Sequence, residues 1–267
     1  MENLEPVLSA ALPVVEKAGK FQMKHFRAVP EEAADIKSLR ETVSFVDVES
    51  ENILRDGLLP LVDGAGFYGE ESGKTGSQES AWVVDPLDGT TNYLSGIDHF
   101  SVSVALVSNN RPVLGIIHQP ATGNTFTSVR DGGVFYNGEL VKPRCLDHAV
   151  EDALFVTGFP YRSPDVAEGF FSAASRILTL GRGIRRSGSA ALDVANLAAG
   201  WYQGFWETDL QPYDVAAGVL MMEENGIVCT NQRGEPYDLF RDRLLVAALP
   251  QVHPPLLAAV VAGYGEL

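Results

Sequence analysis

Two aspartates three residues apart, Asp85 and Asp88, are the side chains of this sequence best placed to do chemistry. They follow an apolar run, residues 81–84, that is typical of a buried strand. Pro86, between them, has a fixed φ and no N–H, so we expect a stiff turn that holds both carboxylates. Such hard oxygen ligands suit Mg²⁺, which usually joins one or two carboxylates to a substrate phosphate.

The residues after Asp88, Gly89-Thr90-Thr91, supply N–H groups and hydroxyls that can bind a phosphate at the start of a helix. The alternative is an ordinary strand-to-helix turn in which an aspartate only caps the helix. A single Asp-Gly pair would favour that ordinary turn. Two spaced aspartates followed by Gly-Thr-Thr favour a metal and phosphate site.

Three further acidic residues lie at element ends. Glu70 ends a short apolar run, and Asp47 and Asp214 each lie where a helix is predicted to begin. Each has an ordinary alternative: Glu70 as a solvated strand end, and the two aspartates as charges that complement the positive end of a helix dipole. Taken alone, none of the three indicates chemistry.

In order and spacing, these segments resemble the inositol monophosphatase family, within the Mg²⁺-dependent, lithium-sensitive phosphatase superfamily. The family's Gly-Glu-Glu box is present from Gly69, and its Asp-Pro-[Ile/Leu]-Asp-Gly-Thr-Thr-Asn box is matched in full from Asp85. The Trp-Asp-x-Ala-Ala-Gly box begins at Tyr213, with tyrosine in place of tryptophan, and Gly-Thr-Ala-Ala appears as Gly-Ser-Ala-Ala from Gly188. The resemblance extends from about residue 37 to residue 218 and implies an enzyme that hydrolyses a small phosphomonoester.

The resemblance also implies a role for each matching position. Two or three Mg²⁺ ions would be bound by four carboxylates and one backbone carbonyl, those of Glu70, Asp85, Asp88, Asp214 and, through its carbonyl, Leu87. Glu70 and Thr90 would orient the attacking water, with Asp47 behind Thr90. The substrate would contact Asp88, Gly89, Thr90, Gly188, Ser189, Ala190, Glu207 and Asp214, with Lys37 on the phosphate side. Two such ions, about 3.5–4 Å apart, can activate a water and stabilise the leaving oxygen.

The favoured substrate is myo-inositol monophosphate. Glu207 lies seven residues before Asp214, the spacing at which the family places a carboxylate that accepts inositol hydroxyls. A solvent-facing strand end is the alternative for Glu207. The nearest alternative function is the same chemistry on fructose-1,6-bisphosphate, another sugar phosphate, NADP or histidinol phosphate. A non-catalytic regulator that binds metal or phosphate is more distant. Glu41 and Ser44 replace the family's Asp and Thr, and both keep the functional group.

The elements that must position these residues change along the chain. Residues 4–26 have a helical period, a second helix is expected from Asp47, and residues 101–140 indicate an antiparallel meander with a hairpin turn at Asn137-Gly138. From about residue 150, strands alternate with helices, which is typical of an α/β layer. The sequence predicts a mixed α/β fold, with portion 1–148 carrying most metal ligands and portion 149–267 carrying the substrate pocket and Asp214. The resemblance implies a layered αβαβα sandwich of the sugar-phosphatase type and a homodimer.

The composition narrows the class of partner. The 267 residues include 35 acidic and 20 basic side chains, a formal net charge of −15. This excess argues against nucleic acid or an anionic membrane as a partner, because both require clustered Lys and Arg. No apolar run approaches the roughly 20 residues of a membrane-spanning helix, and no signal-peptide pattern is present, so we expect a cytoplasmic protein. We assign no chemistry to the five histidines or the two cysteines.

Overall fold

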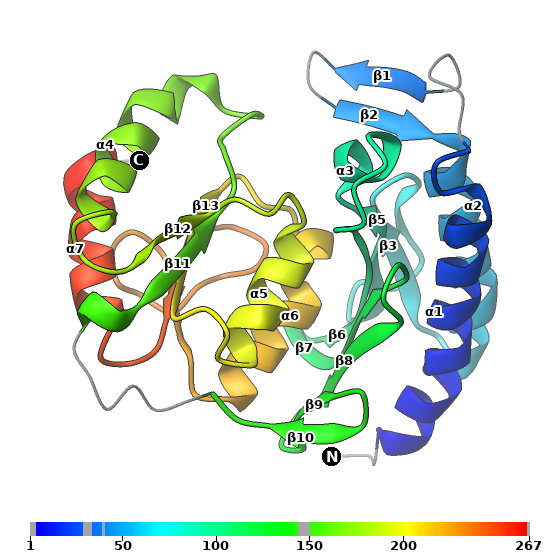
Figure 1. Ribbon diagram of the computed structural model, residues 1–267. Coiled ribbons are helices and arrows are strands. Elements are labelled where there is room, and N and C mark those ends of the chain that lie inside the picture. The colour runs from blue at the N-terminus through cyan, green and yellow to red at the C-terminus, as the bar shows by residue number, and fades with distance from the viewer. Residues whose placement is uncertain (1–3, 29–33, 39–40, 144–149, 266–267) are drawn as a thin grey trace.

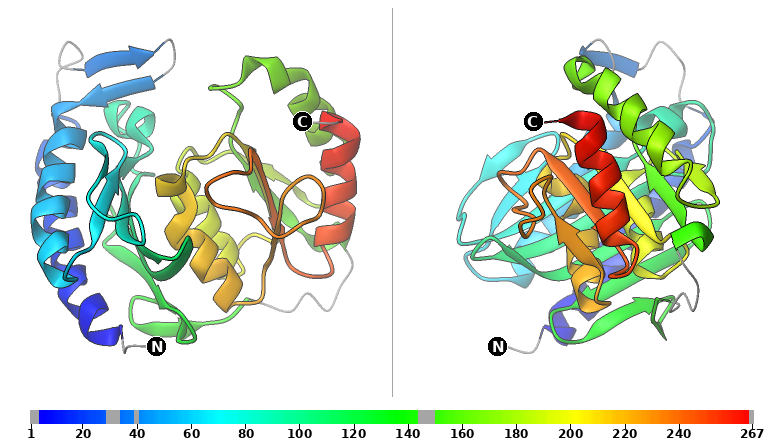
Figure 2. Two further views of the ribbon diagram at one scale, coloured as in Figure 1. Left: turned by 180° about the vertical axis from the view of Figure 1, so that it is seen from behind. Right: turned by 90° about the vertical axis from the view of Figure 1, so that its left-hand side faces the viewer.

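The computed structural model describes residues 4–28, 34–38, 41–143 and 150–265, which fold into five layers (Figure 1). From one side of the molecule to the other, these layers are helices, sheet, helices, sheet and helices, and the view from behind in Figure 2 shows the same order. The arrangement confirms the predicted mixed α/β fold and its αβαβα layering.

The first sheet has eight strands in the order β10-β9-β8-β7-β6-β5-β3-β4. Strands β3 and β5 pair in parallel, and the other neighbours pair antiparallel. The predicted meander is present as β6 to β10, and its last hairpin turns at Asn137 and Gly138, with φ values of 51° and 81°. The strands are β3 (Gly66–Gly69), β4 (Gly73–Thr75), β5 (Ser80–Asp88), β6 (Ser101–Ser108), β7 (Arg111–Gln119), β8 (Asn124–Val129), β9 (Gly133–Tyr136) and β10 (Glu139–Val141).

Helices cover both faces of this sheet, which explains why the first half of β5 is apolar. Trp82 and Val84 pack with the outer helices α1 (Glu5–His25) and α2 (Phe45–Leu58). Val83 points to the opposite face, where it packs with α5 (Ala190–Ala198) and α6 (Pro212–Glu224). Because side chains alternate along a strand, the next residue on the α5/α6 face is Asp85.

The second sheet has five strands in the order β12-β11-β13-β15-β14 and lies on the other side of α5 and α6. Its far face is covered by α4 (Ala167–Ile177) and α7 (His253–Tyr264), which pack beside each other (Figure 2). Among the residues that the structure describes, no helix is long and apolar enough to cross a membrane. The strands are β11 (Leu154–Thr157), β12 (Gly183–Arg185), β13 (Gly204–Thr208), β14 (Val228–Thr230) and β15 (Leu244–Ala248).

The hairpin formed by β1 (Ala34–Ser38) and β2 (Glu41–Ser44) leads directly into α2. The predicted start of this helix at Asp47 is wrong, because the helix begins two residues earlier, at Phe45. Ser44 caps it, accepting a hydrogen bond from the Val46 amide at 3.2 Å, and Asp47 completes a capping box from the third helical position. The cap therefore fixes where the Asp47 carboxylate lies.

The stiff turn predicted after Asp85 is also wrong. Strand β5 continues to Asp88 and contains a bulge, since Asp85 pairs with Ser103 whereas Asp88 pairs with Ser101. Pro86 has no N–H for the ladder, and the Leu87 amide donates instead to Asp85 Oδ1 at 2.9 Å. In an uninterrupted strand, residues 85 and 88 would face opposite sides of the sheet. The bulge changes this alternation and allows both carboxylates to face α5 and α6.

Candidate active site

A cluster of four carboxylates, Glu70, Asp85, Asp88 and Asp214, lies where β5 meets the central helices; we call it the carboxylate cluster. Asp85 and Asp88 are 2% and 9% exposed. Burial raises the pKa of Asp85 well above its ordinary value, and the neighbouring carboxyls of Glu70, Asp88 and Asp214 raise it further. Residues from three separate sequence segments are thus close enough to repel one another.

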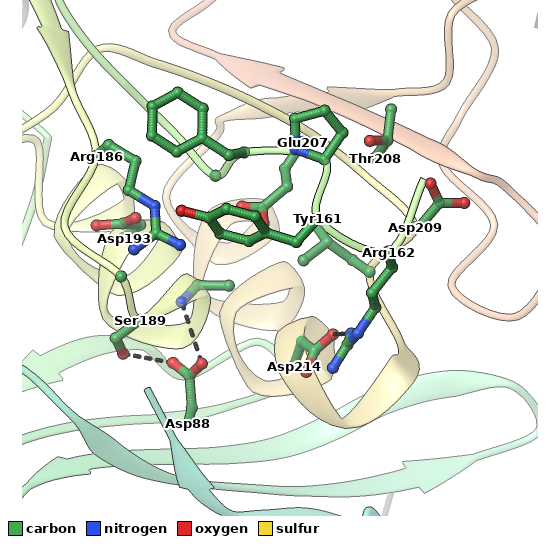
Figure 3. A pocket seen from close by; sticks show the side chains of 16 residues that line it. Asp88, Tyr161, Arg162, Arg186, Ser189, Asp193, Glu207, Thr208, Asp209 and Asp214 are labelled. Carbon is green, nitrogen blue, oxygen red and sulfur yellow. Dashed lines mark hydrogen bonds and ion pairs between the residues drawn. The ribbon is translucent and has the colours of Figure 1, made fainter. Parts of the chain in front are cut away.

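Asp88 joins the first sheet to helix α5. Its carboxylate accepts hydrogen bonds from the amides of Ala191 at 2.8 Å and Ala190 at 3.3 Å, and from the Ser189 hydroxyl (Figure 3). Burial raises its pKa to about 6, although the bonds from Ser189 and the two amides oppose the rise. The positive end of α5 therefore stabilises a buried carboxylate that belongs to another layer of the fold.

The loop after β3 carries Glu70, and a buried residue of α2 holds this loop. Glu51 is 2% exposed and accepts hydrogen bonds from the amides of Glu71 at 2.8 Å and Ser72 at 3.0 Å. A Cβ on Gly69 would lie 2.2 Å from Glu51 Oε2, so this position requires glycine. Glu51 is a functional residue that the sequence motifs do not include. The available signal was its place on the buried face of an amphipathic helix, where an acidic residue needs a partner.

Thr90 and Asp47, which the resemblance implies lie together, contact each other. The Thr90 hydroxyl lies 2.9 Å from Asp47 Oδ1 and 3.0 Å from the carbonyl oxygen of Leu87. Asp47 also accepts hydrogen bonds from the amide of Ser44 at 2.9 Å and from its hydroxyl at 2.6 Å. Burial raises the pKa of Asp47, while these hydrogen bonds oppose the rise. A fixed carboxylate thus controls the orientation of the Thr90 hydroxyl.

Asp214 occupies the first turn of α6, as predicted. It completes a capping box with Gln211, whose amide donates to Asp214 Oδ2 at 2.6 Å. Arg162 forms an ion pair with the same oxygen at 3.3 Å (Figure 3). Arg162 was not predicted; it comes from a loop that precedes Asp214 by more than fifty residues, so no local spacing relates the two.

A cavity of about 170 Å³ opens beside the carboxylate cluster (Figure 3). Most of the residues predicted to bind substrate line it: Asp88, Gly188, Ser189, Ala190, Glu207 and Asp214. Gly89 and Thr90 do not line this cavity, yet they adjoin it, because a Cβ on Gly89 would lie 3.0 Å from the carbonyl oxygen of Gly188. Both glycines have positive φ, 94° and 96°, which favours glycine at this contact between two loops.

The opposite wall of the cavity was missed by the sequence analysis. Residues 158–162 form part of it, and Arg186 lies with its guanidinium carbon 5.0 Å from the centre of the Tyr161 ring and 5.7 Å from that of Phe159. Asp193 lines the same cavity and is 2% exposed. For Asp193, the signal in the sequence was a charged residue inside the otherwise apolar helix pattern of residues 190–198.

One predicted residue, Lys37, cannot be placed in this site. It belongs to β1, but its side chain lies outside the described residues.

The donor chemistry of the carboxylate cluster fits a hard divalent cation. All of its potential ligand atoms are oxygens, which hard divalent cations prefer. The carboxylates repel one another, and a bound cation would offset this repulsion. Within the described residues, no group of three or more His, Cys, Asp or Glu side chains already meets the geometry of a metal site. Arg162 on Asp214 and Ser189 on Asp88 occupy acceptor oxygens that an ion would use. We therefore base the fit on donor type and repulsion.

Comparison with known proteins identifies the class of this protein, a phosphatase. The chain belongs to the Inositol monophosphatase family, whose profile matches residues 3–265. An inositol-1-monophosphatase of Rhizobium meliloti (strain 1021) is 37% identical over 230 residues, which are 85% of this chain and 86% of that protein.

Two solved structures have the same fold. The extragenic suppressor protein suhB from Bartonella henselae has a TM-score of 0.91 and 33% identity, covering 97% of this chain and 100% of that chain. The inositol monophosphatase from Anabaena (Nostoc) sp. PCC 7120 has a TM-score of 0.87 and 30% identity, covering 98% of this chain and 97% of that chain. The resemblance and the enzyme class predicted from the sequence are confirmed.

Proposed function

We propose that this phosphatase is a Mg²⁺-dependent phosphomonoesterase that hydrolyses myo-inositol monophosphate to inositol and inorganic phosphate. The observation that carries the proposal is the contact of Thr90 with Asp47. Thr90 lies on the same segment as Asp85 and Asp88, which belong to the carboxylate cluster. A hydroxyl held by a buried carboxylate, next to oxygen ligands for a cation, is an arrangement suited to directing a water at a phosphate.

The carboxylate cluster and the carbonyl of Leu87 would hold two or three Mg²⁺ ions. Bound there, Mg²⁺ would acidify the attacking water and stabilise charge on the leaving oxygen. The mutual repulsion within the cluster supports this assignment, because a bound cation would remove it.

Thr90 would position the water. A hydroxyl has one proton, and when Thr90 donates it to Asp47, the lone pairs of Thr90 Oγ1 remain free to accept a hydrogen bond from the water. Glu70 would take the one proton that this water loses as its oxygen attacks phosphorus. The attack breaks the bond to the ester oxygen, which takes up a proton from solvent water and leaves as an inositol hydroxyl. The amides of Gly89 and Thr90, at the start of α3 (Thr90–Leu94), would bind the phosphate.

The cavity supports a polyol as the leaving group. Glu207 and Asp193 line it, and both are acceptors when ionised. Burial raises the pKa of Glu207 well above its ordinary value, and the neighbouring Asp193, Asp214 and Asp88 raise it further. A substrate carrying several hydroxyl donors would satisfy these groups.

Phosphate release from a panel of monoesters tests the proposal. We expect myo-inositol 1-phosphate to be preferred over fructose-1,6-bisphosphate, NADP and histidinol phosphate, with activity that requires Mg²⁺ and is inhibited by lithium. Asp85→Asn should abolish release, and Asp131→Asn, at an exposed turn with φ 64°, is the matched control. Inositol phosphate ranking far below the other esters would reject the substrate, and Mg²⁺-independent release would reject the cofactor.

The homodimer and the cytoplasmic location remain predictions, which light scattering of the purified protein and cell fractionation can test.

A further inference from the structure

Two carboxylate oxygens in the cavity wall have no hydrogen-bond partner. Among the described residues, Asp193 Oδ1 and Glu207 Oε2 are both fully buried and unsatisfied. A buried acceptor without a partner costs free energy, typically about 1–3 kcal/mol and more for a charged group. Two such atoms in one cavity wall therefore indicate groups that a ligand is expected to satisfy.

The surroundings of Glu207 hold its carboxylate in place. A Cβ on Gly158 would lie 1.9 Å from Glu207 Oε1, so the absence of a side chain at Gly158 leaves room for this carboxylate. Asp193 is its strongest electrostatic neighbour. In Figure 3 the Glu207 carboxylate lies behind the Tyr161 ring, and the Asp193 carboxylate lies beside the guanidinium of Arg186.

The surroundings of Asp193 also leave one oxygen available. The Ser187 side chain hydrogen-bonds to Asp193, and Arg186 interacts with it electrostatically, yet Oδ1 remains unpaired. Arg186 interacts with Glu207 as well, so one guanidinium partly neutralises both carboxylates. Its stacking on Tyr161 and Phe159 holds this cation at the rim of the cavity.

We propose that Asp193 is a specificity-determining residue, which together with Glu207 accepts hydrogen bonds from two hydroxyl groups on the side of the substrate remote from its phosphate. This inference rests on the proposed function and names the substrate class more closely, as a phosphorylated polyol whose distal end carries neutral hydroxyl donors. A second phosphate at that end would present acceptor oxygens to two carboxyl groups whose unpaired oxygens need donors, and this mismatch disfavours bisphosphates.

The charge of the wall supports a neutral distal group over an anionic one. Both basic residues that line the cavity already interact with carboxylates: Arg162 pairs with Asp214 at 3.3 Å, and Arg186 lies near Asp193 and Glu207. The unsatisfied atoms of this wall are acceptors, so they require donors, which hydroxyl groups supply.

The test compares a substrate that carries these donors with one that lacks them. Asp193→Ala should lower kcat/KM for myo-inositol 1-phosphate by about 10- to 100-fold, the range expected for the loss of one hydrogen bond to a charged group. For 4-nitrophenyl phosphate, which has no hydroxyl donor, the change should stay below about threefold. Asp193→Asn, which keeps one acceptor oxygen, should give an intermediate loss. Asp56→Ala and Asp56→Asn, at an exposed position of α2, are the matched controls.

Substrates lacking single hydroxyls identify the donor. When the missing hydroxyl is the one that Asp193 binds, the wild-type enzyme should hydrolyse the deoxyinositol phosphate more slowly than myo-inositol 1-phosphate. For that deoxy ester, Asp193→Ala should be little slower than wild type. Equal losses on both phosphate esters in Asp193→Ala would show a structural role and overturn the inference while leaving the proposed function intact. A wild-type enzyme that hydrolyses 4-nitrophenyl phosphate but no polyol phosphate would overturn both.

Discussion

The contact of Thr90 with Asp47 gives the sharpest test of the proposed mechanism. Thr90→Val has almost the same shape as the wild-type residue and removes the hydroxyl that lies 2.9 Å from Asp47 Oδ1. Thr90→Ser keeps the hydroxyl and is the matched control. If Thr90 orients the attacking water, the first variant should lose turnover and the second should keep most of it.

The effects of Thr90→Val on the free energy of unfolding and on the rate can be estimated separately. Asp47 is 2% exposed and would lose one of three hydrogen-bond donors, so the free energy of unfolding should fall by about 1.5–3 kcal/mol. The lower end of that range is expected, since both bonds from Ser44 remain. Misplacing a reacting group lowers the rate by about 10²-fold, which corresponds to about 2.7 kcal/mol of barrier.

The assay is steady-state phosphate release at saturating Mg²⁺, with urea unfolding of the same preparations. We expect kcat for Thr90→Val to fall at least about 100-fold with KM changed by less than about threefold, because Thr90 would act on the water rather than on the polyol. Thr90→Ser should stay within about tenfold of wild type. A Thr90→Val enzyme as active as Thr90→Ser, although less stable, would refute the assignment and leave Thr90 with a structural role.

Three further predictions concern the carboxylates and the glycine that makes room for one of them. Asp85→Asn should reduce kcat by at least about 100-fold, and it should raise the melting temperature in the presence of a chelator by removing like-charge repulsion; a lower melting temperature would contradict this account. Gly158→Ala would place a Cβ 1.9 Å from Glu207 Oε1, so KM for inositol phosphate should rise by about tenfold while 4-nitrophenyl phosphate hydrolysis is unchanged. Burial raises the pKa of Asp193 well above 3.8, so the folded state favours its neutral form. That contribution to stability is present below the ordinary pKa and is lost as pH rises through the raised pKa. Between pH 5 and 8, metal-free wild type should therefore lose more stability than Asp193→Asn, and parallel melting curves would refute this.

Local sequence predicted where Asp88, Thr90 and Asp47 lie on their own elements, the first two on one segment and Asp47 near the start of a helix. The pairing of Thr90 with Asp47 was implied only by the family resemblance, because the two residues are 43 positions apart in the chain. The type of turn was not predictable in the same way. Pro86 is compatible with a turn and with a bulge, and the pairing of β5 with β6 decides between them.

The residues of the cavity wall were not predictable from local sequence, because they are brought together by contacts between distant segments. Arg162 and Asp214 are 52 positions apart, and Glu51 holds amides 20 and 21 positions away. Asp193 looks like an ordinary acidic residue near a helix start until the cavity shows that one of its oxygens lacks a partner. The sequence shows a charged residue within a largely apolar helix pattern, whereas only the packed structure shows its unpartnered oxygen and the cavity beside it.

The bond network of Asp88 has a consequence for how the enzyme acquires activity. Its side chain belongs to the first sheet, whereas two amides and the Ser189 hydroxyl that hold it belong to the start of α5. The first sheet itself supplies only the Ser101 hydroxyl, at 3.5 Å, so without α5 it holds this carboxylate weakly. During refolding, phosphate release should appear only after α5 has docked, later than the change in circular dichroism that accompanies sheet formation. Recovered turnover would thus serve as a kinetic reporter of interlayer docking, and a slow step in that docking would limit the yield of active enzyme.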